Sequence, residues 1–306
     1  MVADWDGPLK IYQPETLNFV EKVIDEIYQT YFKTSDLIHL GMDEVRYECW
    51  NSSVEARNYL IEKNYTTFTQ LEEEYIQKTV NFFEKYKNSV NPAIWEDAII
   101  DPNVDTKNLP KNLSIFAWIT TSDYGSIEER LERYLATGLK IIRSQGFYLN
   151  YIYYGEEDAW YKYLNIPVKN LGDNELYGAE ISLWGEYIDA TNIEPRLWPR
   201  GSAAANTFWT GETYQYILEP QTDNNPVGKL DNDLKTDFHH FRCFLVSLGV
   251  YAQPIGPGGF CRHGEIDRFD DIDVLFEEVN HSSGKSLNLS FSMIAVWIAL
   301  FWVKFL

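Results

Sequence analysis

Basic residues and cysteines are scarce in this 306-residue chain. It holds 26 Lys and Arg against 46 Asp and Glu, which gives a formal net charge of −20. That balance argues against a nucleic-acid partner, because binding to phosphates needs a basic surface. The three cysteines are an odd number, so they cannot all pair within the chain. No spacing typical of metal ligands occurs, and we expect neither a metal nor a cofactor.

The chain also has no secretory leader at its first residues, Met1 to Asp6, which are polar and acidic. It nevertheless contains five Asn-x-Ser/Thr sequons, which are weak signals of N-glycosylation when taken singly. They lie at Asn51, Asn64, Asn112, Asn280 and Asn288. The acidic composition fits a protein of acidic lumens or of the cell exterior.

One long apolar run occurs, at the C-terminal end. Residues 293–303 are uninterrupted apolar, but a confident membrane span needs about 18 or more such residues. Small residues at 282–284 and a polar spacer at 285–292 precede the run, an order that resembles a GPI-attachment signal. A tail anchor and a wrongly predicted gene end are the alternatives. We therefore expect residues 1–278 to form the folded part and residues 279–306 to be a spacer with a hydrophobic tail.

Apolar runs and helical spacings alternate along the folded part. The predicted strands are 37–42, 92–96, 113–118, 139–144 and 179–184, and the predicted helices are 15–33, 53–63, 68–87, 126–137 and 233–249. Such alternation is typical of an α/β fold with a parallel sheet. The spacing suits a (β/α)8 barrel, although only five strands are evident.

The stretch from His39 to Trp50, with the adjacent acids Asp43 and Glu44 at the end of a short apolar run, is the most informative motif. Barrel enzymes keep their chemistry at the carboxyl ends of strands. We expect His39, Gly41 and Asp43 to share one face, with Glu44 leaning over the mouth of the strand. An ordinary solvated acid pair at a loop start is the alternative.

Three collinear blocks carry a family resemblance. The first is His39-x-Gly41-x-Asp43-Glu44-Val45-x-x-x-Cys49-Trp50. The second runs from Gly178 through Trp184-Gly185-Glu186 to Arg200, and the third from His240 to Cys261. Over roughly residues 7–265 the chain resembles the family 20 glycoside hydrolases, the β-N-acetylhexosaminidases, and most closely the eukaryotic lysosomal and secreted members.

The resemblance implies that this chain is the C-terminal part of a (β/α)8 catalytic barrel, with strands four to eight and a C-terminal helix. The first three barrel units and the strand-one Arg that grips sugar hydroxyls would then be missing. The implied activity is the removal of terminal β-linked N-acetylhexosamine (GlcNAc or GalNAc) from glycans. The implied mechanism is retaining and substrate-assisted, because the substrate's acetamido oxygen acts as the nucleophile. The resemblance also allows a homodimer, and it places the protein in the secretory pathway, in the lysosome, outside the cell or on its surface.

The same resemblance assigns roles to site residues. Glu44 matches the general acid, whose pKa burial could raise, and Asp43 the group that orients the acetamido and stabilises the cation. Tyr148 matches the hydroxyl that bonds the acetamido oxygen. The sugar pocket would be completed by the aromatic walls Trp95, Trp118 and Trp184 and by the hydroxyl-binding Glu186, for which pairing with Arg196 or Arg200 is the structural alternative. His39 is expected to be a hydrogen-bond partner behind the site rather than a metal ligand.

Two features refine this assignment. Asn150 replaces the usual Asp that contacts the 6-hydroxyl, which leaves the preference among hexosamines open. Cys243 and Cys261 match a pair that the family bridges, while Cys49 matches a cysteine whose family partner lies in the missing segment. We therefore expect a Cys243–Cys261 bridge and a free Cys49.

Two other functions compete with the hexosaminidase. A truncated remnant could be catalytically dead and bind amino sugars at most. A two-carboxylate retaining hydrolase could use Glu186 as its nucleophile, but the adjacent Asp-Glu pair and the Cys-Trp block count against it.

Overall fold

The computed structural model describes residues 7–32, 37–86, 90–102, 104, 106–151, 160–168, 176–211, 232–256 and 259–261. The chain divides into two compact units. The first consists of Met1–Gln145 and Leu171–Tyr177, and the second of Gly146–Asn170 and Gly178–Leu306. The expected tail at 279–306 and the sequons Asn280 and Asn288 lie outside the described residues.

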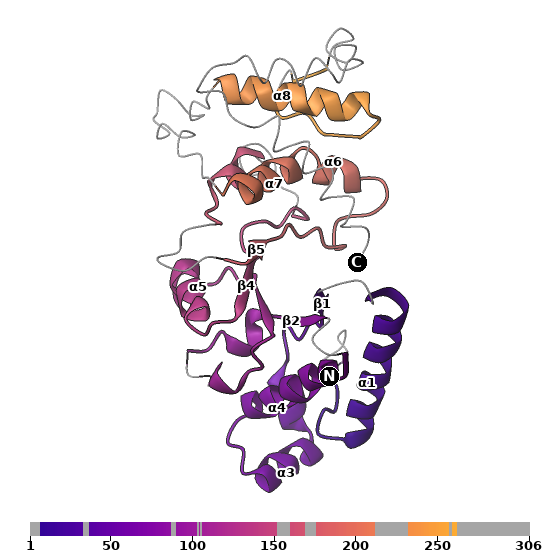
Figure 1. The fold of residues 1–306 in the computed structure, drawn as a ribbon, viewed down its shortest axis with the longest axis vertical. Coiled ribbons are helices and arrows are strands. Elements are labelled where there is room, and N and C mark those ends of the chain that lie inside the picture. The colour runs from indigo at the N-terminus through magenta and orange to yellow at the C-terminus, as the bar shows by residue number, and fades with distance from the viewer. Residues whose placement is uncertain are drawn as a thin grey trace. The chain divides into compact units, whose positions relative to one another are not determined.

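The first unit is built on a parallel sheet (Figure 1). Its strands are β1 (Leu37–His39), β2 (Asn91–Trp95), β3 (Ser114–Ala117) and β4 (Lys140–Arg143). Each strand pairs in parallel with the next one along the chain. All four residues of β3 are buried, as expected for a sheet covered on both faces. Just beyond these strands, the N–H of Tyr177 donates to the carbonyl of Ile141 at 2.8 Å.

Helices precede and connect the strands of this unit. They are α1 (Pro14–Ile27), α2 (Tyr47–Ser52), α3 (Val54–Lys63), α4 (Phe68–Asn81) and α5 (Ile127–Leu135), with a π-helical turn η1 (Tyr28–Phe32) and the 3-10 turns η2 (Phe82–Tyr86), η3 (Glu96–Ile99) and η4 (Thr106–Asn108). The apolar residues Ile76 and Val80 of α4 join Ile94, Ile115 and Leu131 in one buried cluster. The helical spacing read between residues 68 and 87 therefore marks the face that packs on the sheet.

Capping side chains set two helix starts in this unit. Ser126 and Glu129 form a capping box at α5, and Thr67 and Gln70 form one at α4. In each box the two side chains satisfy backbone N–H groups that have no partner inside the helix. The helix boundaries are thus fixed by local chemistry and not only by packing.

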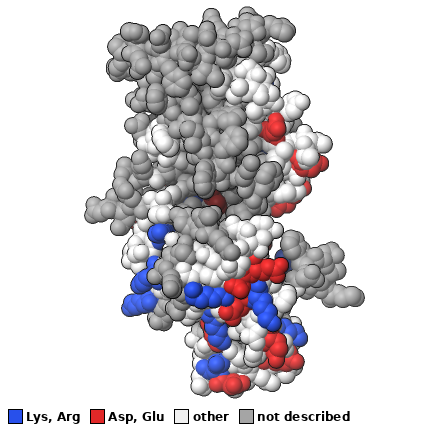
Figure 2. Space-filling view, turned by 45° about the vertical axis from the view of Figure 1, so that its right-hand side comes forward, with Lys and Arg blue, Asp and Glu red and all other residues white. Residues whose placement is uncertain are grey.

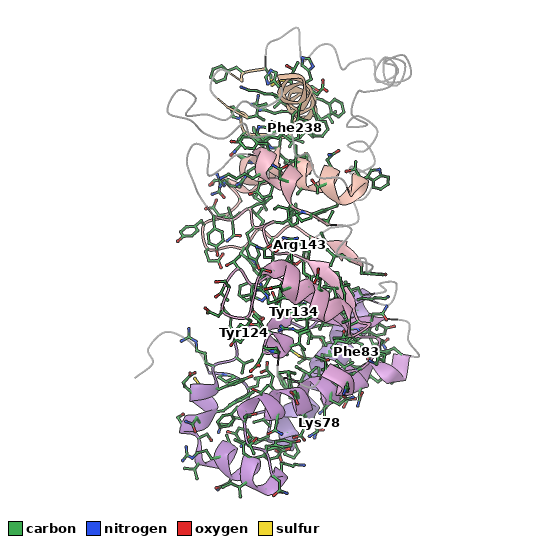
Figure 3. The ribbon with its side chains drawn as sticks, turned by 90° about the vertical axis from the view of Figure 1, so that its left-hand side faces the viewer. Lys78, Phe83, Tyr124, Tyr134, Arg143 and Phe238 are labelled. Atoms are coloured by element: carbon green, nitrogen blue, oxygen red, sulfur yellow. A yellow bond between two sulfur atoms is a disulfide. The ribbon has the colours of Figure 1, made fainter. Side chains whose placement is uncertain are left out.

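The second unit has little sheet and several helices. It contains β5 (Gly178–Ala179), the 3-10 turn η6 (Trp160–Asn165), α6 (Ile193–Leu197), α7 (Arg200–Thr210) and α8 (Asn232–Ser247). A parallel bridge joins Tyr148 and Ser182. Trp160 stacks on Phe238 of α8 (labelled in Figure 3) with ring centroids 4.0 Å apart. The small residues Ala203 and Ala204 of α7 are fully buried in the same core.

The expected disulfide is present in the second unit. Cys243 and Cys261 are bonded, with Cα atoms 5.4 Å apart, while Cys49 is free. The Arg242 guanidinium adds hydrogen bonds to the carbonyls of Ala252 and Gly259. Together these contacts hold the segment after α8 against that helix.

The predicted order of five strands with intervening helices is confirmed, and with it the partial α/β barrel. Four of the five strands are shorter than predicted, the first and the last by the most. β1 ends at His39 rather than at residue 42, and β5 covers 178–179 rather than 179–184. The short helices α2 and α6 were not anticipated, because neither is long enough to show a helical period. Among the described residues, no helix is long and apolar enough to span a membrane.

Candidate active site

The loop after β1 carries the two candidate catalytic carboxylates. Gly41, Met42 and Glu44 have positive φ angles of 73°, 71° and 50°. The alternation of a strand therefore stops at His39, and the prediction that His39, Gly41 and Asp43 share one strand face is wrong. Left-handed backbone is costly for residues with a Cβ, so Met42 and Glu44 need contacts that hold them in place.

Hydrogen bonds to the neighbouring strand β2 provide some of these contacts. The N–H of Leu40 donates to the carbonyl of Ala93 at 2.8 Å, and the N–H of Trp95 donates to the carbonyl of Gly41 at 3.0 Å. Backbone pairing with β2 thus continues two residues beyond β1. It places Asp43 and Glu44 at the carboxyl end of the sheet, where they are both exposed.

His39 contacts the backbone of this loop. Its Nδ1 accepts the N–H of Gly41 at 3.0 Å, and its ring packs against Trp95 and Phe116 with centroids 4.5 and 4.7 Å away. Burial lowers the pKa of His39 to about 4, so the imidazole is neutral over most of the physiological range. Its buried Nε2 has no hydrogen-bond partner among the described residues.

Asp97 was not anticipated as part of the site. Its Oδ1 accepts the backbone N–H of Glu44 at 3.0 Å, and its Oδ2 accepts the indole N–H of Trp118 at 2.7 Å. One carboxylate therefore joins the acid loop to an expected aromatic wall. The sequence signal that could have indicated Asp97 is its position. Glu96-Asp97 is an acidic pair at the end of an apolar strand, just as Asp43-Glu44 is.

The two aromatic walls of the first unit lie together. Trp95 ends β2 and Trp118 directly follows β3, and their rings meet edge to face at 6.4 Å. Trp95 is buried, with 8% of its surface exposed, whereas Trp118 is partly exposed. Trp118 is thus the more open of the two.

A buried network supports the backbone of Trp118. Glu96 Oε1 accepts the N–H groups of Trp118 and Ile119 at 2.7 and 2.6 Å. Its Oε2 accepts the hydroxyl of Tyr134 (labelled in Figure 3) at 2.7 Å and lies 3.5 Å from Arg130 Nε. Burial raises the pKa of Glu96. The ion pair of Glu96 and Arg130 orders the loop after β3, because Arg130 also donates to the carbonyls of Thr121 and Gly125.

A cavity of about 420 Å³ opens beside the acid loop, lined in part by Asp43, Glu44 and Glu72. Glu72 of α4 is 4% exposed and accepts the Tyr47 hydroxyl. Burial raises the pKa of Glu72 to about 7. The cavity thus presents two exposed carboxylates and one that holds its proton near neutral pH.

The second unit contains the remaining predicted residues. Tyr148 is partly exposed, and its ring stacks on Tyr151 at 6.3 Å. Burial raises the pKa of Tyr148, so its hydroxyl stays protonated and able to donate. Trp184 is 44% exposed, and Glu186 is exposed. Asn150 is 2% exposed, and its Oδ1 has no hydrogen-bond partner among the described residues.

The arginines considered as partners of Glu186 make backbone contacts. Arg196 donates to the carbonyl of Tyr151 at 2.6 Å, and Arg200 donates to that of Leu149 at 2.9 Å. These bonds order the chain around Asn150. Asn206 and Thr207 of α7 are buried, and Thr207 donates to the carbonyl of Tyr163 at 3.0 Å, so both belong to the packed interior of the second unit.

Charged residues of both signs lie on the surface of the first unit (Figure 2). On the face drawn in Figure 2, Lys and Arg lie among Asp and Glu over the first unit and do not gather into one basic patch. In the described part of the chain, no group of three or more His, Cys, Asp or Glu could hold a metal ion.

Comparison with known proteins identifies the family. The model for "Glycosyl hydrolase family 20, catalytic domain" matches residues 2–212. Beta-hexosaminidase subunit beta of Homo sapiens is 31% identical over 264 residues, which cover 84% of this chain and 42% of that protein. Beta-hexosaminidase subunit alpha of Mus musculus is 30% identical over 259 residues, covering 82% and 44% respectively. The chain spans about two fifths of the length of these relatives.

Solved structures agree on the fold. An exo-β-N-acetylglucosaminidase of Vibrio harveyi, in complex with N-acetylglucosamine, has a TM-score of 0.60 and 17% identity, covering 81% of this chain and 37% of its own. A β-N-acetylhexosaminidase of Bacteroides fragilis also has a TM-score of 0.60, with 16% identity and coverage of 80% and 47%. The family model spans more than half of the chain, and the fold agrees: this chain belongs to glycosyl hydrolase family 20.

Proposed function

We propose that the protein carrying this chain is a β-N-acetylhexosaminidase, which releases terminal β-linked GlcNAc or GalNAc from glycoconjugates. The observation that carries this proposal is the acid pair Asp43-Glu44 at the carboxyl end of β1, beside a cavity and within a family 20 catalytic domain. No cofactor is needed, because the nucleophile belongs to the substrate.

Glu44 protonates the leaving oxygen and then activates water. Asp43 accepts the acetamido N–H and stabilises the oxazolinium-like cation. Both side chains are exposed on a backbone held by β2 and Asp97, so both can meet a substrate. This use of two adjacent carboxylates differs from the opposed pair of ordinary glycosidases.

The remaining predicted residues are proposed to bind the substrate. Tyr148 donates to the acetamido oxygen, which its raised pKa supports. Trp95, Trp118 and Trp184 form aromatic walls, for which an apolar ring face is suited. Glu186 and Asn150 take the sugar hydroxyls. His39 supports the acid loop through Gly41 rather than touching the sugar.

Family membership also supports a proposal about the location of the protein. We place the protein in the secretory pathway, as a lysosomal, extracellular or cell-surface glycoprotein, with a homodimer as its assembly. The apolar C-terminal tail fits a GPI signal or a tail anchor. Release from cells by a phosphatidylinositol-specific phospholipase C would support the GPI form; solubility without lipase or detergent would remove both membrane forms.

The test uses the longest polypeptide that the transcript encodes. It should release free N-acetylhexosamine from aryl β-N-acetylglucosaminides and β-N-acetylgalactosaminides, and EDTA should have no effect. Proton NMR of the first product should show the β-anomer, which is retention. Sugar binding without turnover would instead identify a non-catalytic binding protein. An inverted product would exclude the substrate-assisted mechanism.

A further inference from the structure

We infer that Asp97 is a positioning residue, which fixes the general acid Glu44 relative to the aromatic wall Trp118. This inference rests on the proposed function and adds a residue to it. Asp97 touches neither substrate nor reacting atoms in this account. It acts through two donors that belong to different loops of the first unit.

The first contact is to the acid loop. The N–H of Glu44 donates to Asp97 Oδ1 at 3.0 Å, and Glu44 has a φ of 50°. A residue with a Cβ does not hold this conformation unaided. A charge-assisted hydrogen bond to the strained peptide is a strong local restraint, so Asp97 fixes the direction in which the Glu44 side chain leaves the loop.

The second contact is to the wall. The indole N–H of Trp118 donates to Asp97 Oδ2 at 2.7 Å, which sets the angle of the ring. The backbone of Trp118 is held separately, because Glu96 accepts its N–H at 2.7 Å. The ring orientation can therefore be disturbed without unfolding the loop, which makes the Asp97–Trp118 contact testable by itself.

Two carboxylate oxygens are needed for this arrangement. An amide at position 97 has one acceptor oxygen, so either the N–H of Glu44 or the indole N–H of Trp118 would lose its partner. Burial raises the pKa of Asp97, while the two donors oppose that rise. Asp97 follows β2 directly, in η3 (Glu96–Ile99), and is therefore anchored by the rigid sheet.

The experiment compares Asp97→Asn, Asp97→Glu, Trp118→Phe and the Asp97→Asn/Trp118→Phe double variant in the longest encoded polypeptide. Asp123→Asn is the matched control, because Asp123 is an exposed acid on the loop after β3. Each protein is assayed on a dinitrophenyl and an alkyl β-N-acetylglucosaminide. Misplaced catalytic groups typically cost up to about 100-fold in rate.

We expect Asp97→Asn to lower kcat about 10- to 100-fold on the alkyl substrate, and much less on the dinitrophenyl substrate, which needs little protonation. KM should change little, and Asp97→Glu should recover part of the loss. In the double variant, Trp118→Phe should lower kcat little further than Asp97→Asn alone, since both substitutions break the same contact. Asp123→Asn should behave as wild type.

Equal losses on both substrates would overturn the role of Asp97, because a smaller fraction of folded enzyme slows every substrate alike. Fully independent effects of Asp97→Asn and Trp118→Phe would overturn it as well. Failure of the proposed function would look different: the wild-type polypeptide itself would turn over neither substrate, and the inference about Asp97 would fall with it.

Discussion

At the scale of single residues, the adjacent acids Asp43 and Glu44 have separable roles. Glu44→Gln should remove general-acid help and lower kcat about 10²–10⁴-fold on poor leaving groups. The loss should be smaller for a good leaving group, which departs with less protonation. Steady-state kinetics over a series of aryl leaving groups would measure how the loss in kcat depends on the pKa of the leaving group. A loss that is the same for every leaving group would contradict the assignment.

Asp43→Asn should behave differently from Glu44→Gln. Stabilisation of the cation precedes departure of every leaving group, so the variant should slow good and poor substrates alike. The same aryl series provides the comparison, with Glu44→Gln as the internal control. Full activity of Asp43→Asn on the activated substrates would show that Asp43 does not contact the acetamido group.

Glu72 makes the stability of the fold depend on pH. Its pKa is about 7 in the folded protein against about 4.5 in the unfolded chain, so the folded state binds the proton more tightly. The stabilisation is fully present below about pH 4.5 and is lost as the pH rises through 7, by about 3 kcal/mol in all. His39 acts in the opposite direction, because its lowered pKa makes stability fall as the pH drops from about 6.5 to 4.

Urea unfolding of the longest encoded polypeptide, as wild type and as Glu72→Gln, measures this effect. Relative to Glu72→Gln, the wild type should lose about 3 kcal/mol of unfolding free energy between pH 4.5 and 7.5. The variant keeps a side chain of the same shape, so packing hardly changes. A difference that stays constant across this range would refute the raised pKa of Glu72.

At the scale of elements, the Cys243–Cys261 bridge ties the end of the described chain to α8. The two residues are 18 apart in sequence, and a bridge of this kind typically adds about 2–4 kcal/mol. The double variant Cys243→Ala/Cys261→Ala should lose that amount in chemical unfolding, whereas Cys49→Ala should change little. Peptide mapping that found Cys49 joined to either other cysteine would contradict the pairing.

The strands could be predicted from the sequence, but the site loop could not. Runs such as Ser114–Ala117 are buried on both faces, and burial of that kind leaves an apolar signature that is readable without coordinates. The positive φ values of Met42 and Glu44 leave no such mark, since neither residue is Gly or Asn. Asp97 was missed for a related reason: its importance lies in contacts to residues 53 and 21 positions away.

At the scale of the whole molecule, the described part of the chain contains five strands of a barrel, and the chain spans about two fifths of the length of its relatives. A barrel closes only when its last strand meets its first, and open edges invite aggregation. We therefore expect the purified 306-residue polypeptide to be inactive or poorly folded. Circular dichroism, gel filtration and an aryl-hexosaminide assay would check this, and measurable hexosaminidase activity would refute it.

The central claim, a catalytic site whose nucleophile belongs to the substrate, is tested most directly by removing the acetamido group. The measurement is the ratio of kcat/KM for an aryl β-N-acetylglucosaminide to that for the matching β-glucoside, made on the longest encoded polypeptide. A β-glucoside has no acetamido group and therefore no intramolecular nucleophile, and the enzyme has no group of comparable effective concentration to replace it. The ratio of kcat/KM should therefore exceed about 10³. Hydrolysis of the β-glucoside at the same rate as the β-N-acetylglucosaminide would contradict the account.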